Sequence, residues 1–241
     1  MQFSCTQENL AQGLSVASHV AGKNINLPIL GNVLIKCDDT VLHLLATNLE
    51  IAVSCIVRGK MEKPGEFTVP SRLFSDYVSL LPKERVDVET NGTAMVITCG
   101  SYKTRLNGIA ASEFPLIPTV ERKRKFSVRV GDFRRAIGQV LFAVAPNESR
   151  PEISGVMCKF VPKGGGDADL ILAATDSYRL ADRIVPAVVE SGGNQDPETL
   201  IIPGRTVSEF VRILGVFKDA IDGPDTVEIY SSDNQVLFAF A

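Results

Sequence analysis

Residues 1–21 read MQFSCTQENLAQGLSVASHVA, and residues 125–145 read KFSVRVGDFRRAIGQVLFAVA. The two stretches share apolar positions at a constant shift of 123 residues: Phe3 with Phe126, Leu10 with Phe133, Leu14 with Ile137 and Ala17 with Val140. Each stretch opens like a short strand and then repeats apolar residues at three- and four-residue intervals, as one face of a helix does. The pattern predicts a strand followed by an amphipathic helix, present twice.

Three more pairs of stretches follow in the same order. They are LPILGNVLIK (27–36) with RPEISGVMCK (150–159), LATNLEIAV (45–53) with AATDSYRLA (173–181), and TVPSRLFSDYVSLLP (68–82) with IIPGRTVSEFVRILG (201–215). The shift grows from 123 to 128 and then 133 residues, as insertions in loops would cause; KGGGDAD (163–169) is one such insertion. Four matches in register indicate a duplicated unit.

Each copy predicts the same order of elements: a strand, a helix, several strands, a second helix and a hairpin. Pro70 and Pro203 precede the second helices, where no backbone donor is needed. Asp132 is a candidate N-cap, and Asn91-Gly92 favours a type I′ hairpin turn. The sequence therefore predicts an α+β protein with repeated domains at residues 1–120 and 121–241. In each domain two helices pack against antiparallel sheets.

The composition fits a folded chain without a membrane span or secretion signal. Hydrophobic residues make up 45% of the 241 residues and charged residues 22%, which is enough to bury a core. No apolar run is long enough to span a bilayer, and the N-terminus has no basic and apolar signal pattern. Five widely spaced cysteines form no C-x-x-C pair, which favours reduced thiols and a cytoplasmic location. The net charge of −3 makes local charge more informative than the total; the densest basic run is ERKRKF (121–126).

The second copy ends earlier than the first. After its hairpin the first copy continues with SYKTRLNGIAASEFP (101–115), whereas the second ends in VLFAFA (236–241). A sheet that ends on an apolar strand leaves backbone groups unpaired. We therefore expect either a fragment of a longer protein or a neighbouring chain that completes the sheet.

Several separated blocks resemble one known family along the whole chain. They are NLPILGNVLIK (26–36), TVPSRLFSDYVSLLP (68–82), LNGIAASEFP (106–115), SGVMCKF (154–160) and ILAATDSYRLA (171–181). These blocks are similar to the bacterial sliding clamp family, the β subunits of DNA polymerase III. The resemblance implies a DNA clamp fold with three units per chain, the third of which is missing here, and helices on the concave inner face. It also implies a head-to-tail homodimeric ring of six units around duplex DNA.

The implied function is that of a processivity factor, the non-catalytic subunit of a DNA-directed DNA polymerase, whose holoenzyme is a nucleotidyltransferase. A closed ring keeps a tethered polymerase at high effective concentration on the template. Sliding along any sequence needs attraction to phosphates without base readout. The basic residues on or beside the predicted helices are therefore expected to face DNA: Lys23, Arg72, Arg134, Arg135, Arg205 and Arg212. By resemblance, Lys23 and the loop PNESRPE (146–152) lie where clamps approach DNA, although Glu152 would repel phosphate.

The resemblance also implies a pocket that accepts short peptide motifs of the polymerase α subunit, the clamp loader and repair proteins. The matching residues are Ile153, Thr175, Ser177, Tyr178, Arg179 and Leu180. A preformed apolar groove with a few polar groups suits this role. A buried Leu or Phe anchor would contribute about 1.5–3 kcal/mol. In the family the remaining wall follows the second unit, so weak peptide binding is expected here.

A third implied feature is the subunit interface, in which the free edge of the first unit meets the third unit of a partner. The matching residues are Leu73, Tyr77, Lys103, Arg105 and Leu106. Without a third unit, we expect this chain not to close a ring by itself. A two-domain protein that forms a trimeric ring, or a DNA-binding module that forms no ring, are the alternatives.

An enzyme is the competing class of protein. Neither histidine, His19 or His43, lies near a cluster with metal-ligand spacing. The glycines at 164–166 lack a phosphate-binding fingerprint, and Asp176 and Asp182 merely flank a turn. We therefore expect no catalytic residue, no metal and no cofactor.

Overall fold

A computed structural model describes residues 1–22, 27–122, 124–147, 149–191, 196–217, 224–232 and 234–240. The chain divides into two compact units, Met1–Ile117 and Pro118–Ala241. This division lies three residues before the boundary at 120/121 that the sequence predicts. Each unit is described by itself below.

The first unit contains two α-helices, two short 3₁₀ helices and nine strands among its described residues. In chain order these are β1 (Gln2–Thr6), α1 (Gln7–Val20), η1 (Pro28–Gly31), β2 (Asn32–Cys37), β3 (Leu42–Thr47), β4 (Ala52–Val57), β5 (Gly59–Lys63), β6 (Gly65–Pro70), α2 (Ser71–Ser79), β7 (Arg85–Asn91), β8 (Ala94–Cys99), β9 (Tyr102–Asn107) and η2 (Ala111–Glu113).

The second unit repeats this order up to its hairpin. Its elements are β10 (Arg124–Arg129), α3 (Val130–Val140), η3 (Leu141–Ala143), β11 (Gly155–Gly164), β12 (Asp167–Thr175), β13 (Leu180–Ser191), β14 (Glu198–Pro203), α4 (Gly204–Val216), β15 (Thr226–Ser231) and β16 (Val236–Ala239). The predicted α+β fold, with two helices and antiparallel sheets in each unit, is confirmed.

The two sheets of the first unit exchange their first strands. One sheet has the order β5-β1-β7-β8-β9 and the other β4-β3-β2-β6. Strand β1 therefore leaves its sequence neighbours and pairs with β7, with Phe3 opposite Val88. Strand β6 does the reverse and pairs with β2, with Val33 opposite Val69. We call β1–β5 the first half of the unit and β6–β9 the second half. The first half thus contributes β1 and β5 to the sheet of β7, β8 and β9, and the second half contributes β6 to the sheet of β2, β3 and β4.

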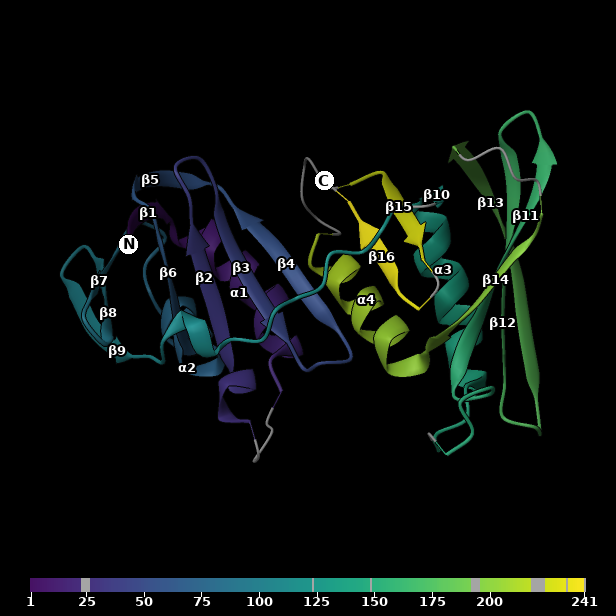
Figure 1. The fold of residues 1–241 in the computed structure, drawn as a ribbon, viewed down its shortest axis with the longest axis horizontal. Coiled ribbons are helices and arrows are strands. Elements are labelled where there is room, and N and C mark those ends of the chain that lie inside the picture. Colours follow the sequence, from purple (N-terminus) through teal and green to yellow (C-terminus); the bar gives the residue numbers. More distant parts are fainter. Residues whose placement is uncertain are drawn as a thin grey trace. The chain divides into compact units, whose positions relative to one another are not determined.

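The second unit has the same pairings in one continuous sheet of order β14-β11-β12-β13-β10-β15-β16. The long strand β13 pairs with β12 and then with β10, as β4 and β5 do separately with β3 and β1. Even the register irregularity recurs, between Gln2 and Phe3 and between Lys125 and Phe126. In the view of Figure 1, β15 and β16 are drawn between α4 and α3, and β11 to β13 lie beyond α3.

Helix α1 forms as its sequence pattern predicts. The Thr6 hydroxyl accepts a hydrogen bond from the Asn9 backbone N–H at 3.3 Å, which is an N-cap contact. The predicted apolar face is buried: Leu10, Leu14, Ala17 and Val20. The Gln7 side chain, also buried, donates to the Val78 carbonyl at 2.8 Å and so joins the two helices of the unit.

Two local predictions are wrong by small shifts. Asp132 is not the N-cap of α3, because the helix begins at Val130 and Asp132 lies in its first turn. The backbone N–H of Val130 donates instead to the Asp225 carbonyl at 2.9 Å.

The β7–β8 loop consists of Gly92 and Thr93, and only Gly92 has a positive φ. A type I′ turn has positive φ at both central residues, whereas a type II′ turn has it only at the first. The loop is therefore a type II′ turn and not the predicted type I′ turn.

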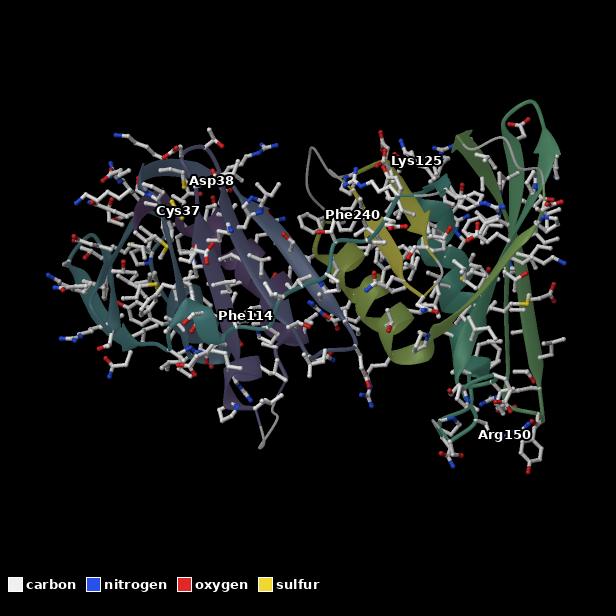
Figure 2. All side chains as sticks on the ribbon, in the orientation of Figure 1. Cys37, Asp38, Phe114, Lys125, Arg150 and Phe240 are labelled. Atoms are coloured by element: carbon white, nitrogen blue, oxygen red, sulfur yellow. The ribbon has the colours of Figure 1, made fainter. Side chains whose placement is uncertain are left out.

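Each unit has its own apolar core. In the second unit the rings of Phe126 and Phe160 stack at 3.9 Å. Strand β16 is fixed to the helices by aromatic contacts, since Phe238 stacks on Phe210 at 4.3 Å and Phe240 meets Phe217 at 5.6 Å (Figure 2). Ring pairs at these distances stabilise beyond the area that they bury. These contacts cover the apolar face of an edge strand.

The end of the first unit is a strap that returns to β6. Thr68 donates its hydroxyl to the Ile109 carbonyl at 2.6 Å and accepts the Ile109 N–H through its own carbonyl at 3.3 Å. Further along, Phe114 packs with the buried Ile29 and Leu30 (Figure 2). A Cβ at Gly108 would lie 1.9 Å from the Thr68 carbonyl oxygen. Only glycine fits this approach without backbone movement.

Among the residues that the structure describes, no helix is long and apolar enough to cross a membrane.

The close approach at Gly108 predicts opposite stability effects for two glycine substitutions. Gly108→Ala places a methyl group against the Thr68 backbone and the Phe67 ring, so it should lower the free energy of unfolding by about 1–3 kcal/mol. Gly138→Ala, in α3 with no atom within 4 Å of its Cβ, should raise it by about 0.5–1 kcal/mol. Chemical denaturation followed by circular dichroism measures both. Equal effects of the two substitutions would contradict the packing described.

Candidate functional site

The turn between β12 and β13 holds the residues of the predicted peptide pocket. Asp176 accepts hydrogen bonds from the backbone N–H groups of Tyr178 and Arg179, both at 3.0 Å. These contacts, led by the Tyr178 N–H, hold the pKa of the Asp176 carboxyl below its usual value. The Thr175 hydroxyl donates to the Arg179 carbonyl at 2.7 Å and accepts from the Ser177 N–H at 3.1 Å. Thr175 and Asp176 therefore shape the turn.

The same turn presents apolar surface to solvent. Tyr178 is 97% exposed and Leu180 71% exposed. Ser177 has a φ of 76°, a strained value for a residue with a side chain. Such strain in a folded protein is maintained by the surrounding hydrogen bonds and is often found at binding sites. The turn thus has a rigid backbone and unburied apolar side chains.

A clasp formed by Asp176, Arg179 and Phe142 borders this surface. The Arg179 guanidinium bonds to the Asp176 carboxylate at 2.9 Å and lies 5.4 Å from the centre of the Phe142 ring. Phe142, in η3, is 58% exposed and was not predicted as part of the site. Ile153 is half-buried, and its carbonyl accepts from the Ala145 N–H just after η3. The clasp brings η3 to the turn that the sequence identified.

The first unit contains a copy of this turn with different chemistry. The Thr47 hydroxyl donates to the Ile51 carbonyl at 2.9 Å and accepts from the Leu49 N–H at 3.0 Å. Asn48 accepts from the Glu50 and Ile51 N–H groups, as Asp176 does in the second unit. Leu49 has a φ of 78° and is 59% exposed. Both units therefore share the backbone conformation of this turn, whereas the Asp176–Arg179–Phe142 clasp is a feature of the second unit.

The predicted DNA-facing residues fall into two groups. Arg72 lies 3.9 Å from Asp76 and Arg135 lies 3.8 Å from Asp132, and all four side chains are well exposed. Long, exposed ion pairs contribute little, so these guanidinium groups can exchange partners. Arg212 differs, because its side chain is only 26% exposed and bonds to Glu209 at 2.6 Å. A phosphate would have to displace that carboxylate.

The other predicted residues of this set are Arg134, Arg205 and Lys23. Arg134 is half-buried on α3, and Arg205 lies in the first turn of α4. Lys23 lies outside the described residues. Helix α1 has no arginine or lysine, and its Glu8 pairs with Lys83 at 2.8 Å. On α2, α3 and α4, acidic residues therefore offset part of the positive charge of the arginines.

In the loop before β11, a basic residue and an acidic residue pair with each other. Arg150 and Glu152 form an ion pair at 3.1 Å (Figure 2). The pKa of the Glu152 carboxyl lies below its usual value, because a backbone hydrogen bond and then the Arg150 side chain favour its charged form. Glu152 therefore presents less uncompensated negative charge than its sequence context indicates.

Basic residues of the run at 121–126 form contacts within the second unit. Arg124 pairs with Glu198 at 3.1 Å, and Lys125 pairs with Glu228 at 2.8 Å. The Lys125 contact, followed by that of Tyr230, lowers the pKa of Glu228. Arg122 lies over the Tyr230 ring at 4.8 Å. The described part of this run therefore holds β10 against β14 and β15.

The predicted subunit edge includes exposed and buried residues. Strand β9 is the last strand of its sheet, with Lys103 and Arg105 exposed. Leu73 on α2 is 55% exposed. Leu106, in contrast, is only 7% exposed, and Tyr77 packs partly against the same core, where burial raises the pKa of its phenol. Of the five predicted residues, Leu73, Lys103 and Arg105 are therefore the exposed ones, and Tyr102 on β9 is exposed as well.

Comparison with known proteins gives two consecutive matches to one family. The N-terminal domain of the DNA polymerase III beta subunit matches residues 1–118, and its central domain matches residues 127–241. The beta sliding clamp of Synechocystis sp. is 29% identical over 255 residues, covering 99% of this chain and 63% of that protein. The Bacillus subtilis beta sliding clamp is 26% identical, covering 99% of this chain and 62% of that protein.

Solved structures agree. The DNA polymerase III subunit beta of Pseudomonas aeruginosa superimposes with a TM-score of 0.86 at 27% identity, over 99% of this chain and 62% of that one. The Bacillus subtilis sliding clamp gives a TM-score of 0.85 at 25% identity, again over 99% and 62%. The chain thus spans less than two thirds of the length of these relatives. With both units matched in order, the chain belongs to the DNA polymerase III beta subunit family and contains that family's N-terminal and central domains.

Proposed function

We propose that this chain serves as part of a sliding clamp that encircles duplex DNA and confers processivity on a replicative DNA polymerase. The observation that carries the proposal is the match of its two units to successive domains of one family. The duplicated topology supports it, since a ring is built from repeated units of like shape. The work of such a protein is topological, and we assign no catalytic residue to it. Its place would be the bacterial cytoplasm, as the non-catalytic subunit of a nucleotidyltransferase.

Duplex DNA would be held through weak, sequence-independent contacts. We place Arg72, Arg134, Arg135 and Arg205 in the DNA-facing set, and we assign Arg212 mainly to its bond with Glu209. Paired carboxylates moderate the attraction of Arg72 and Arg135 for phosphate. Such moderation suits sliding, because tight phosphate contacts would slow movement along the helix.

Peptide segments of the polymerase α subunit and the clamp loader would dock at the β12–β13 turn. Tyr178, Leu180 and Ile153 supply apolar surface, and the Arg179–Phe142 clasp borders it. Two relatives support a ligand site in this family. A Pseudomonas aeruginosa clamp is described bound to griselimycin. A Caulobacter crescentus clamp is described with PEG bound to its beta-motif tethering region.

The ring itself would close head to tail through the β9 edge of one subunit. Unpaired backbone groups of an edge strand are a template for pairing with another chain. Leu73 would add an apolar contact, and Lys103 and Arg105 would add charge complementarity at the rim. Leu106 and Tyr77 would act by supporting the edge from the core.

Retention on closed DNA tests the proposed function. The assembled clamp, loaded onto nicked circular duplex DNA, should remain bound during gel filtration and should dissociate after a restriction enzyme linearises the circle. The reason is that a ring leaves linear DNA by sliding off its ends. Equal retention on circular and linear DNA would indicate a binding module that forms no ring.

A substitution at the turn tests the peptide site. Leu180→Asp removes an apolar anchor contact of about 1.5–3 kcal/mol, so the Kd for a short peptide with a Leu-Phe anchor should rise at least tenfold. Leu49→Asp is the control, because Leu49 is an exposed apolar residue of the equivalent turn in the first unit, where it takes the place of Ser177. Fluorescence anisotropy of labelled peptide measures both. If Leu49→Asp weakened peptide binding and Leu180→Asp did not, the peptide would bind at the first unit, and the proposed site at the β12–β13 turn would be contradicted.

A further inference from the structure

A small notch between α3 and β13 brings together two arginines that lie far apart in the sequence. Its volume is about 90 Å³, and its lining includes Asp132, Arg135 and Gln139 from α3 and Arg183 from β13. Helix α3 packs beside β13 in the second unit (Figure 1). The notch therefore has polar walls from a helix and from the neighbouring strand.

The strand pattern places Arg183 on the helix side of the sheet. Its partner in the register is Leu172, which is fully buried, and Val185 two residues later is also buried. Arg183 is itself exposed, at the point where this side of the sheet opens to solvent. In the described part of the chain no carboxylate pairs with its guanidinium group. Arg183 is therefore a charged residue on the face of the sheet whose residues Leu172 and Val185 are apolar and buried, which favours the binding of an anion there.

The charges of the notch favour an anion. The lining contains two arginines and one carboxylate, and the Asp132 carboxylate is 3.8 Å from the Arg135 guanidinium, too far for a good hydrogen bond. Gln139 adds an amide donor, while Ala136 and Val185 provide an apolar floor. Guanidinium groups bind phosphate through paired N–H donors. The arrangement thus matches a tetrahedral oxyanion.

The volume narrows the class of ligand. A site of about 90 Å³ exceeds the roughly 30 Å³ that one water occupies in the liquid. It is well below the roughly 300–1,000 Å³ typical of sites for small organic molecules. A notch of this size suits one phosphate group rather than a whole nucleoside.

We propose that Arg183, together with Arg135 and Gln139, forms a phosphate-binding notch that takes one backbone phosphate of duplex DNA. The choice of DNA as the source rests on the proposed function, whereas the anion site stands on the notch itself. Arg183 lies on a strand, so this contact adds a strand residue to a DNA surface otherwise assigned to helices. Asp132 limits the strength of the contact by competing for Arg135.

Arginine side-chain and backbone NMR spectra of the protein, titrated separately with inorganic phosphate and with a short DNA duplex, test the proposal. Both ligands should shift the signals of Arg183, Arg135 and Gln139. Arg183→Gln should abolish the phosphate response and lower the salt dependence of duplex binding by about one unit of slope. Asp132→Asn should have the opposite effect and tighten phosphate binding, because it removes the competing carboxylate.

Lys159→Gln is the control for lost charge, since Lys159 pairs with Ile171 and so lies on the other face of the same sheet from Arg183. It should leave the phosphate response intact. Duplex binding without any shift at the notch would overturn the notch and leave the proposed function standing. A response to phosphate but not to duplex would overturn the assignment to DNA. An unchanged response in both Arg183→Gln and Arg135→Gln would overturn the site. Both side chains are exposed, so neither substitution removes a buried contact.

Discussion

The pairing of the first strand with the far half of its own unit is the constraint on which the structure depends. Strand β1 crosses to β7 and β6 crosses to β2, so neither half has a complete sheet without the other. Helix α1 follows directly from β1, and α2 from β6, so the crossing also sets where each helix begins. Their apolar faces are buried as a consequence. The second unit repeats this through β10 and β15.

Because the scaffold is over-determined, its two copies can differ in surface chemistry. The Thr–Asx turn keeps the same hydrogen bonds at Thr47 and Thr175. Only the second copy adds an arginine that bonds to the turn and lies over a phenylalanine ring. Charge has diverged in the same way, since α1 has no lysine or arginine whereas α3 carries Arg134 and Arg135. Binding surfaces thus vary on a backbone that does not.

The sequence predicted the fold well because each helix and strand carries its periodicity locally. Leu10, Leu14 and Ala17 could be assigned to a buried face from spacing alone. Caps and turns were less predictable: Asp132 lost the N-cap position because the helix starts two residues earlier, where a distant carbonyl at Asp225 accepts the Val130 N–H. The exact start of a helix depends on such tertiary contacts.

The candidate site was predictable only where it is local. The site residues between Thr175 and Leu180 were predicted from the resemblance of ILAATDSYRLA to a known family. Phe142 and Arg183 were not predicted, because their neighbours are distant in the chain. The role of the basic run at 121–126 likewise depends on Glu198 and Glu228. The position of Arg212 on a helix predicts a DNA-facing residue, but its guanidinium is bonded to Glu209 one turn before it, a contact that helix position alone does not predict.

Native-state hydrogen exchange tests the crossing of strands most directly. If each half completes the sheet of the other, the slowest amides of β1, β2, β6 and β7 should share one opening free energy, equal to that of global unfolding of the unit. The amides of β10, β11, β14 and β15 should do the same in the second unit. Two separate protection levels, one for β2–β3–β4 and another for β7–β8–β9, would show that the halves open independently and would contradict the account.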